Sequence, residues 1–259
     1  MKRILIILSL TVVMSFVLLG NAKLHAATMD DRIESSAKQT YVFKTYLKND
    51  DITVSSSDGE VTLTGTVEEE PHLSLAGDTV AGLPDVKSVD NKLTIQERTH
   101  SAGTDAWLIT KVKLALLFHK NVNAAATSVS AEEGVITLRG EASSIAQKDL
   151  TGEYAGDVEG VRSVNNMMSV PASAQDKSMI GMKAEALGEA VDDASITAMV
   201  KGTLLYHRST SALNTNVVTE KGVVTLKGKA GNDAEKALAG KLANDVHGVK
   251  KVVNDMTTD

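Results

Sequence analysis

The chain has 259 residues, 27 of them basic and 33 acidic, which gives a formal net charge of −6 at pH 7. Cysteine is absent, which excludes disulfide bonds, thiol nucleophiles and lipid attachment at a lipobox cysteine. Aromatic residues make up only 3% of the chain, so its cores must be built from Val, Leu, Ile and Ala, as in small α/β units. An acidic chain is also poorly suited to non-specific binding of phosphate backbones, and we expect no nucleic-acid partner.

Residues 1–26 carry the features of an export signal. A basic start at Lys2 and Arg3 precedes an apolar run from Ile4 to Leu19, and small residues including Ala26 follow. This order is typical of a secretory signal peptide, and the run of about 16 residues is shorter than the roughly 20 needed to span a bilayer. We predict cleavage near Ala22 or Ala26 and export to the periplasm; the alternative is an uncleaved anchor.

Three stretches of the chain repeat one pattern without an internal gap: residues 29–98, 104–172 and 192–259. Such self-similarity indicates duplicated units. We expect each copy to close its own core. Glycines recur at the expected hairpins and at helix–strand junctions, where we assign them structural roles. They are Gly59, Gly65, Gly134, Gly140, Gly160, Gly222, Gly228 and Gly248.

The residue pattern within each repeat predicts the element order α-β-β-α-β. An Asp at the start, such as Asp193, is expected to be the N-cap of the first helix. In the third repeat, strands follow at Asn216–Thr219 and Val223–Gly228, and apolar residues at helical spacing continue from Ala234 to Val246. The predicted fold class is α+β: three tandem α-β-β-α-β modules, each with two helices packed on one face of a three-stranded mixed sheet.

Each predicted second helix contains a glycine, at Gly77, Gly152 or Gly240. Glycine inside a helix costs about 1 kcal/mol relative to alanine. Recurrence in all three copies predicts a close contact between helix and sheet; the alternative is inheritance by duplication without a structural role.

Two linkers join the repeats. Residues 99–103 are short and polar, whereas residues 173–191 form a longer segment. Apolar residues at helical spacing in it, among them Ile180, Ala184 and Leu187, predict a short amphipathic helix. That helix is expected either to dock on a neighbouring module or to remain exposed.

The repeat pattern resembles the BON domain family. The stretches that carry the resemblance are Gly134–Gly140, Gly160–Asn166, Gly222–Gly228 and Gly248–Asn254. They match a strand motif of the form G-x-V-x-L-x-G and a closing motif of the form G-V-x-x-V-x-N. The first repeat departs from the pattern, because Asp85 stands where the closing glycine is expected.

This resemblance implies a periplasmic protein, often linked to osmotic stress, that attaches to phospholipid or to another envelope surface. It implies no catalysis and supplies no catalytic residues. The alternative function is a periplasmic protein-interaction or chaperone-like module, with other periplasmic proteins as partners.

The residues give no independent sign of catalysis either. The sequence lacks a nucleophile elbow and a zinc-binding histidine motif, so we predict no catalytic residue, no metal and no cofactor. His119 and His207 occupy equivalent positions at the ends of first helices, where a polar or cationic group suits the helix dipole. The acidic run at residues 68–70 is interpreted as a solvated surface rather than a calcium site.

Two features point to a surface contact. Charge is graded, from net −7 in residues 29–98 through −2 in residues 104–172 to +1 in residues 192–259. The single tryptophan, Trp107, stands where the sister repeats have Arg32 and Ser195. We therefore predict Trp107 as a candidate lipid contact; the alternative is that it packs over the core edge or on a neighbouring module.

Overall fold

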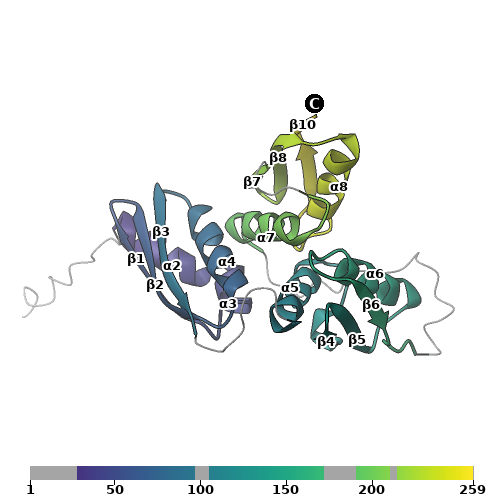
Figure 1. Cartoon of the computed structure of the whole chain (residues 1–259). Coiled ribbons are helices and arrows are strands. Elements are labelled where there is room, and N and C mark those ends of the chain that lie inside the picture. Colours follow the sequence, from purple (N-terminus) through teal and green to yellow (C-terminus); the bar gives the residue numbers. More distant parts are fainter. Residues whose placement is uncertain (1–27, 97–104, 172–190, 211–214, 259) are drawn as a thin grey trace, which may run out of the picture.

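The computed structural model describes residues 28–96, 105–171, 191–210 and 215–258. The predicted signal peptide and the predicted linker helix lie outside these residues. The described chain forms three modules, shown in Figure 1. We call residues 28–96 module 1, residues 105–171 module 2 and residues 191–258 module 3.

The modules share one order of elements. Module 1 contains α2 (Met29–Gln39), α3 (Tyr41–Thr45), β1 (Asp51–Ser57), β2 (Glu60–Val67), α4 (Glu70–Ala81) and β3 (Ser88–Ile95). Module 2 contains α5 (Asp105–Phe118), a 3-10 turn at Ala124–Ala126, β4 (Thr127–Glu132), β5 (Val135–Gly140), α6 (Ile145–Gly156) and β6 (Ser163–Asn166). Module 3 contains α7 (Asp193–Tyr206), β7 (Thr215–Glu220), β8 (Val223–Ala230), α8 (Asp233–Asn244), β9 (Lys251–Asn254) and β10 (Thr257–Thr258).

Each sheet has the hairpin's second strand at its centre. The hairpin is antiparallel, and the last long strand runs parallel to the central one, so the sheet is mixed. Alternate residues of the central strands are buried, as Ile136 and Leu138 are in β5, because the helices cover only one face. The predicted fold class is confirmed, and module 3 adds β10, which pairs with β8.

The hairpins close through two-residue turns in which both residues have positive φ. These are Asp58–Gly59, Glu133–Gly134 and Lys221–Gly222, with φ between 49° and 82°. Such a turn is of type I′, whose twist matches that of the flanking strands. All eight glycines assigned structural roles from the sequence have positive φ.

The repeated aspartates bind these turns and do not cap their own helices, which corrects the N-cap prediction. The carboxylate of Asp105 accepts hydrogen bonds from Glu133 N at 2.7 Å and Gly134 N at 2.9 Å. Asp30 and Asp193 make the equivalent pairs of bonds. Each Asp lies in the first turn of its helix, and the N-caps of α2 and α7 are Thr28 and Asp192. The carboxylate of each Asp therefore ties the helix start to the hairpin.

The first helix of module 1 is interrupted, whereas α5 runs for the expected four turns. Thr40 has extended backbone angles, and its hydroxyl donates to Ala37 O at 2.8 Å while accepting from Phe43 N. The N–H groups released at the start of α3 bond to module 3: Tyr41 N donates to Asp192 Oδ2 and Val42 N donates to Ser195 Oγ. The break therefore docks module 1 on the N-terminus of α7.

The cores do not follow the module boundaries as predicted. Module 2 has a core of its own, but one continuous cluster of buried side chains runs through modules 1 and 3 and includes Phe118 of module 2. The physical reason is α7, which is buried continuously from Ala194 to Val200. A helix buried all round serves two neighbours, and α7 packs on its own sheet and on α4 (Figure 1).

Within the described ranges, no helix is both long enough and apolar enough to cross a membrane.

Candidate surface-binding site

The sheet of module 3 has an outer face that combines lysines with exposed valine. Because side chains alternate along a strand, burial of Val224 and Leu226 on the helix side places Lys227 and Lys229 on the other side. Lys251 of β9 and Val218 of β7 lie on the same outer side and are exposed. Glu220 is exposed on the same side of β7, opposite Val223. We call these residues the outer face of module 3: Val218, Glu220, Lys227, Lys229 and Lys251.

Strand pairing sets the spacing of this face. Val218 of β7 lies opposite Thr225 of β8, and Asn216 lies opposite Lys227. On the other side of β8, Lys251 is paired with Val223. The three ammonium groups therefore lie on β8 and β9, to one side of Val218 on the edge strand β7. Val218, at 55%, is the most exposed large hydrophobic residue in the described structure.

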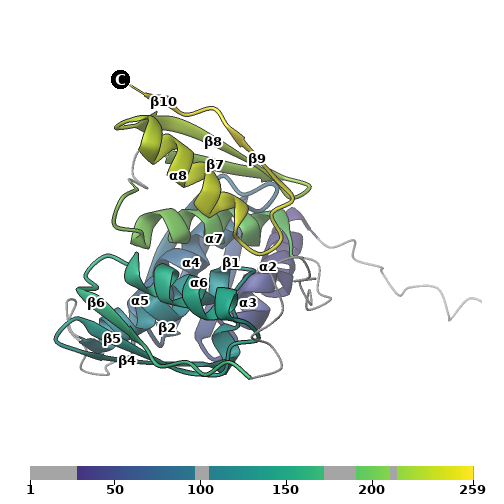
Figure 2. The same ribbon diagram turned by 90° about the vertical axis from the view of Figure 1, so that its right-hand side faces the viewer.

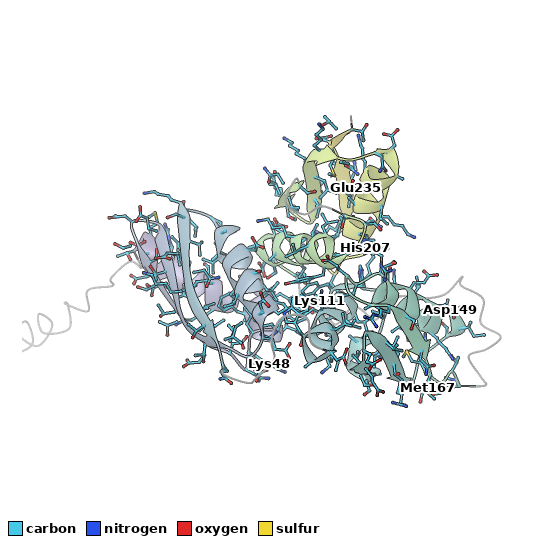
Figure 3. All side chains as sticks on the ribbon, viewed as in Figure 1. Lys48, Lys111, Asp149, Met167, His207 and Glu235 are labelled. Carbon is cyan, nitrogen blue, oxygen red and sulfur yellow. The ribbon has the colours of Figure 1, made fainter. Side chains whose placement is uncertain are left out.

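The corresponding faces of the other modules have a different character. In module 1 the outer residues include Asp51, Glu60 and Asp90, and the amine of Lys92 is paired with Asp90 at 2.8 Å. In module 2 the exposed hydrophobic residues are Val135, Ile145 and Met167, and Figure 3 shows Met167 at the outer edge of that module. The outer face of module 3 is therefore the basic one, in agreement with the charge gradient along the chain.

Trp107 lies where the three modules meet. Its Nε1 donates to Glu70 Oε2 of module 1 at 2.6 Å, and its ring makes an edge contact with Tyr206 of module 3 at 6.5 Å between centroids. The Lys111 ammonium lies 3.8 Å from the ring centroid. Trp107 is half-buried, so it packs on neighbouring modules, and the predicted lipid contact stays a prediction for the part of the ring that solvent reaches.

Burial shifts the pKa values of titratable groups at this junction. Lys111 is buried, and its Nζ donates to Glu159 O at 2.7 Å. Burial lowers the pKa of Lys111, because desolvation disfavours the charged ammonium. Burial also raises the pKa of Tyr206 to about 12. Packing between the modules is the cause of both shifts.

Among the described residues, the polar groups that could suggest a metal-binding or catalytic site have structural roles. No group of three or more His, Asp or Glu side chains among them is arranged to hold a metal ion. His72 Nδ1 lies 2.7 Å from Asp50 Oδ2, and the same aspartate accepts from Glu68 N. This Asp–His pair therefore joins the segment before β1 to the start of α4.

The histidines at the ends of the first helices are buried polar groups, and the cationic role that the sequence also allowed does not apply. His119 is 3% exposed, and His207 is largely buried as well. Burial lowers the pKa of both, that of His119 to about 4, so they are neutral at pH 7 and do not act as cations at a helix C-terminus. Their equivalence in two repeats was the signal that they share an environment, which is a contact between modules.

Comparison with known proteins gives one family and one curated relative. A model of the BON domain matches residues 29–97, 104–172 and 192–259. The chain is 33% identical over 154 residues to osmotically-inducible protein Y of Escherichia coli (strain K12), an alignment that covers 60% of this chain and 72% of the relative.

Among solved structures, two of CdsD, a structural protein of the type III secretion system of Chlamydia trachomatis, match at 17% identity and a TM-score of 0.23. They cover 88% of this chain and 95% or 91% of the solved chains, and at this TM-score the similarity carries no structural conclusion. The three family matches span most of the chain and coincide with three modules of one fold. The chain therefore belongs to the BON domain family, with three copies of the domain.

Proposed function

We propose that this chain is a non-enzymatic periplasmic protein of the osmotic-stress response, and that it binds anionic phospholipid surfaces of the cell envelope through the outer face of module 3. The name of the E. coli relative supports the link to osmotic stress. The signal-like segment at residues 1–26 supports export. The single observation that supports the membrane contact is that Lys227, Lys229 and Lys251 lie exposed on the same sheet face as Val218.

The mechanism is electrostatic attraction with a small apolar contact. Each lysine near an anionic membrane contributes about 1 kcal/mol, and salt weakens the attraction because it screens exposed charges. Insertion of Val218 adds apolar burial at the interface. The acidic outer face of module 1 is repelled by the same membrane, so the gradient orients the protein with module 3 toward the lipid.

Vesicle co-sedimentation of the mature chain tests this function. We expect binding to vesicles that contain phosphatidylglycerol, weaker binding to phosphatidylcholine alone, and a loss of binding as salt rises. The triple variant Lys227→Glu, Lys229→Glu, Lys251→Glu should bind at least roughly tenfold more weakly. A matched control changes Lys38, Lys44 and Lys48 of module 1, all exposed, to Glu and alters the net charge equally.

Equal losses in the two triple variants would contradict a specific face, and absence of binding at low salt would remove the lipid function. Recovery of a stable protein complex from envelope extracts without any lipid binding would favour the protein-interaction alternative.

The fluorescence of Trp107 separates two modes of lipid contact. Binding through the outer face of module 3 leaves the junction closed, and the emission maximum of Trp107 should stay constant when vesicles are added. A blue shift on binding would instead support insertion of Trp107 into the lipid.

A further inference from the structure

The helix ends of modules 2 and 3 are joined by two short antiparallel backbone contacts. In the first, Lys120 N donates to Asp245 O at 3.0 Å and His247 N donates to Phe118 O at 2.9 Å. Residues His119 and Val246 face each other between these two bonds. The contact joins the end of the first helix of module 2 to the end of the second helix of module 3.

The second contact exchanges the roles of the modules. Glu159 N donates to Tyr206 O at 2.9 Å and Arg208 N donates to Asp157 O at 3.0 Å, and Val158 faces His207 between them. Here the end of the second helix of module 2 meets the end of the first helix of module 3.

These two contacts are equivalent under the sequence repeat. The offset of 88 residues that aligns module 2 with module 3 converts each of the four hydrogen bonds into another of the four. Both modules therefore use the same patch, so the interface is isologous, as in a two-fold symmetric dimer. We call this patch the helix-end surface; it comprises residues 118–120 and 157–159 of module 2 and residues 206–208 and 245–247 of module 3.

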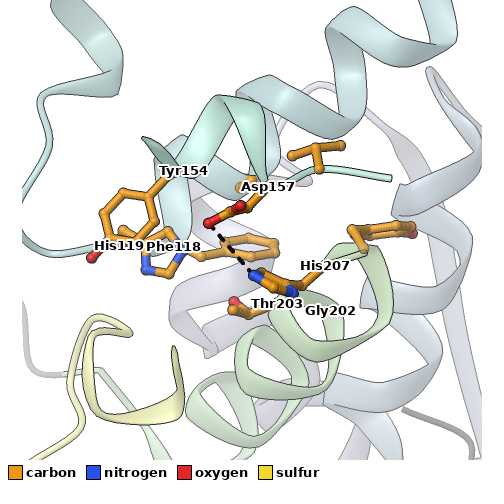
Figure 4. Close-up of a pocket in the computed structure, with 10 residues that line it drawn as sticks. Phe118, His119, Tyr154, Asp157, Gly202, Thr203 and His207 are labelled. Atoms are coloured by element: carbon orange, nitrogen blue, oxygen red, sulfur yellow. Dashed lines mark ion pairs between the residues drawn. The ribbon is translucent and has the colours of Figure 1, made fainter. Parts of the chain in front are cut away.

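Side chains beneath the backbone contacts close the interface. The ring of His119 stacks on Tyr154 with 3.8 Å between centroids, and the Tyr154 hydroxyl donates to Asp245 Oδ2 at 3.1 Å. The cavity that remains has a volume of about 20 Å³ and is lined by both histidines, His119 and His207, and by Thr203 (Figure 4). A space of that size admits nothing larger than a water molecule, so the helix-end surface is a contact between modules and not a ligand pocket.

The arrangement of layers agrees with this pairing. In Figure 2 the helices of modules 2 and 3 face one another, and their sheets lie on the outside. Ser128 of β4 and Asn216 of β7, which are equivalent under the repeat, are both exposed and therefore report the distance between the paired modules.

Module 1 cannot make the same contact. Pro84 occupies the position of Glu159 and His247, whose N–H groups donate across the interface, and proline has no N–H to donate. Module 1 instead docks elsewhere: Tyr41 N bonds to Asp192, the N-cap of α7, and Lys201 is paired with Asp78 at 2.9 Å. The equivalent turn of module 1 thus lacks the donor that the helix-end surface requires.

We propose that the helix-end surface is a module-docking surface, that its partner is a second BON module with a backbone N–H at the position of Glu159, and that Pro84 excludes module 1 from this pairing. The four bonds join main-chain atoms. The two patches carry different side chains at equivalent positions: Lys120 corresponds to Arg208, and Glu159 corresponds to His247. The surface therefore requires a backbone N–H at these positions, and side-chain bonds such as those from Lys120 Nζ to Asn244 O and from Tyr154 to Asp245 add to the contact.

A distance measurement in the full chain tests the proposal. The chain has no cysteine, so Ser128→Cys and Asn216→Cys introduce a single pair of spin labels for double electron–electron resonance. We expect one narrow distance distribution. Addition of Glu159→Pro and His247→Pro removes two of the four bonds and should broaden the distribution severalfold, whereas Glu159→Ala with His247→Ala keeps both N–H groups and should leave it narrow.

Two outcomes overturn the proposal: a distribution that stays narrow in the proline variant, or one that broadens equally in the alanine control. Proline occurs naturally at this turn in module 1, so we expect the turn to accept it. A second pair of spin labels inside module 2, at Ser128→Cys and Glu153→Cys, verifies that this module is folded in the variant.

A measurement without any substitution is independent of folding of the variants. Hydrogen exchange of the unmodified chain should show the amides of Lys120, Glu159, Arg208 and His247 protected to a similar degree, because they belong to one interface. Rapid exchange of these amides would also overturn the proposal.

Discussion

Gly152 of α6 and Asn166 of β6 lie so close together that a Cβ atom at residue 152 would stand 2.8 Å from Asn166 Nδ2. The Asn166 amide donates to Lys148 O of the helix at 2.7 Å, and its oxygen accepts from Met168 N at the strand end. Modules 1 and 3 repeat the pair as Gly77 with Asn91 and Gly240 with Asn254. The predicted close contact between second helix and sheet is therefore confirmed, and its reason is the asparagine that links the two.

Replacement of Gly152 by alanine should destabilise module 2. Alanine normally stabilises a helix interior by about 1 kcal/mol relative to glycine, but here the added methyl group would displace the Asn166 amide. We expect a net loss of about 1–3 kcal/mol, measured as a lower urea midpoint. Trp107, the single tryptophan, lies in α5 of this module and reports the transition.

Gly156→Ala in the same helix is the matched control. A Cβ atom there would meet Val164 Cγ2 at 3.5 Å, which is an ordinary contact distance, so the midpoint should remain or rise slightly. If Gly152→Ala raises the midpoint as well, the Gly–Asn contact does not constrain the helix.

Acid should weaken the interface between modules 2 and 3. His119 faces Tyr154 of α6 and the Asp245 and His247 segment of module 3, and His207 faces Asp157 and its neighbour Arg208. Burial lowers the pKa of His119 from 6.5 to about 4 and also lowers the pKa of His207. The unfolded chain therefore binds more protons than the folded chain between these values, and stability rises with pH across that window.

For His119 alone, the stability lost between pH 6.5 and pH 4 is about 3 kcal/mol. Urea unfolding at half-unit steps of pH measures the slope, and His119→Phe, which retains a ring against Tyr154, should flatten it. Hydrogen bonds from Ser56 and from the Gly59 and Asp58 amides hold the pKa of Asp30 below its ordinary value, so Asp30 contributes to the pH dependence at lower pH. An equal slope in His119→Phe would contradict the assignment to His119.

Asp105→Ala should loosen the hairpin of module 2. The substitution removes a carboxylate that accepts two backbone N–H groups of the type I′ turn, and we expect a loss of about 1–2 kcal/mol. Thermal unfolding measures the change. Asp149→Ala, at an exposed position of α6, removes the same charge, and a loss as large in that control would indicate a general effect of charge.

Asp85→Gly should stabilise module 1. Asp85 has a φ of 67° at the position where modules 2 and 3 have Gly160 and Gly248, with φ of 95° and 82°. A left-handed conformation costs a residue with a side chain roughly 1 kcal/mol, offset in part by the greater chain entropy of glycine. We therefore expect a melting temperature that rises by a few degrees; a fall would show that the Asp85 side chain makes a compensating contact.

The repeat pattern predicted the modules well because each one depends on local rules. Alternation along strands, glycine at turns that need positive φ and apolar residues at helical spacing all act within about 70 residues. The equivalence of Gly152 with Gly77 and Gly240 even indicated the helix–sheet contact before the partner asparagine was identified.

Relations between modules were not predictable in the same way. For Trp107 the sequence left two alternatives, a lipid contact or packing on a neighbouring module, because the packing partners Glu70 and Tyr206 belong to two other modules. The role of Asp105 was misread because its partners, Glu133 and Gly134, lie 28 and 29 residues away in the sequence. Both cases concern contacts that leave no periodic signal.

Main-chain bonds at the helix ends leave the two paired copies free to diverge. Mutation of Lys120, Arg208, Glu159 or His247 to any other amino acid with an N–H preserves the four backbone hydrogen bonds of the contact. After duplication, one copy can acquire a lysine-rich exterior while its sister remains acidic, without separation of the two. Proline is the residue type that breaks this tolerance, and the first copy of the domain carries it.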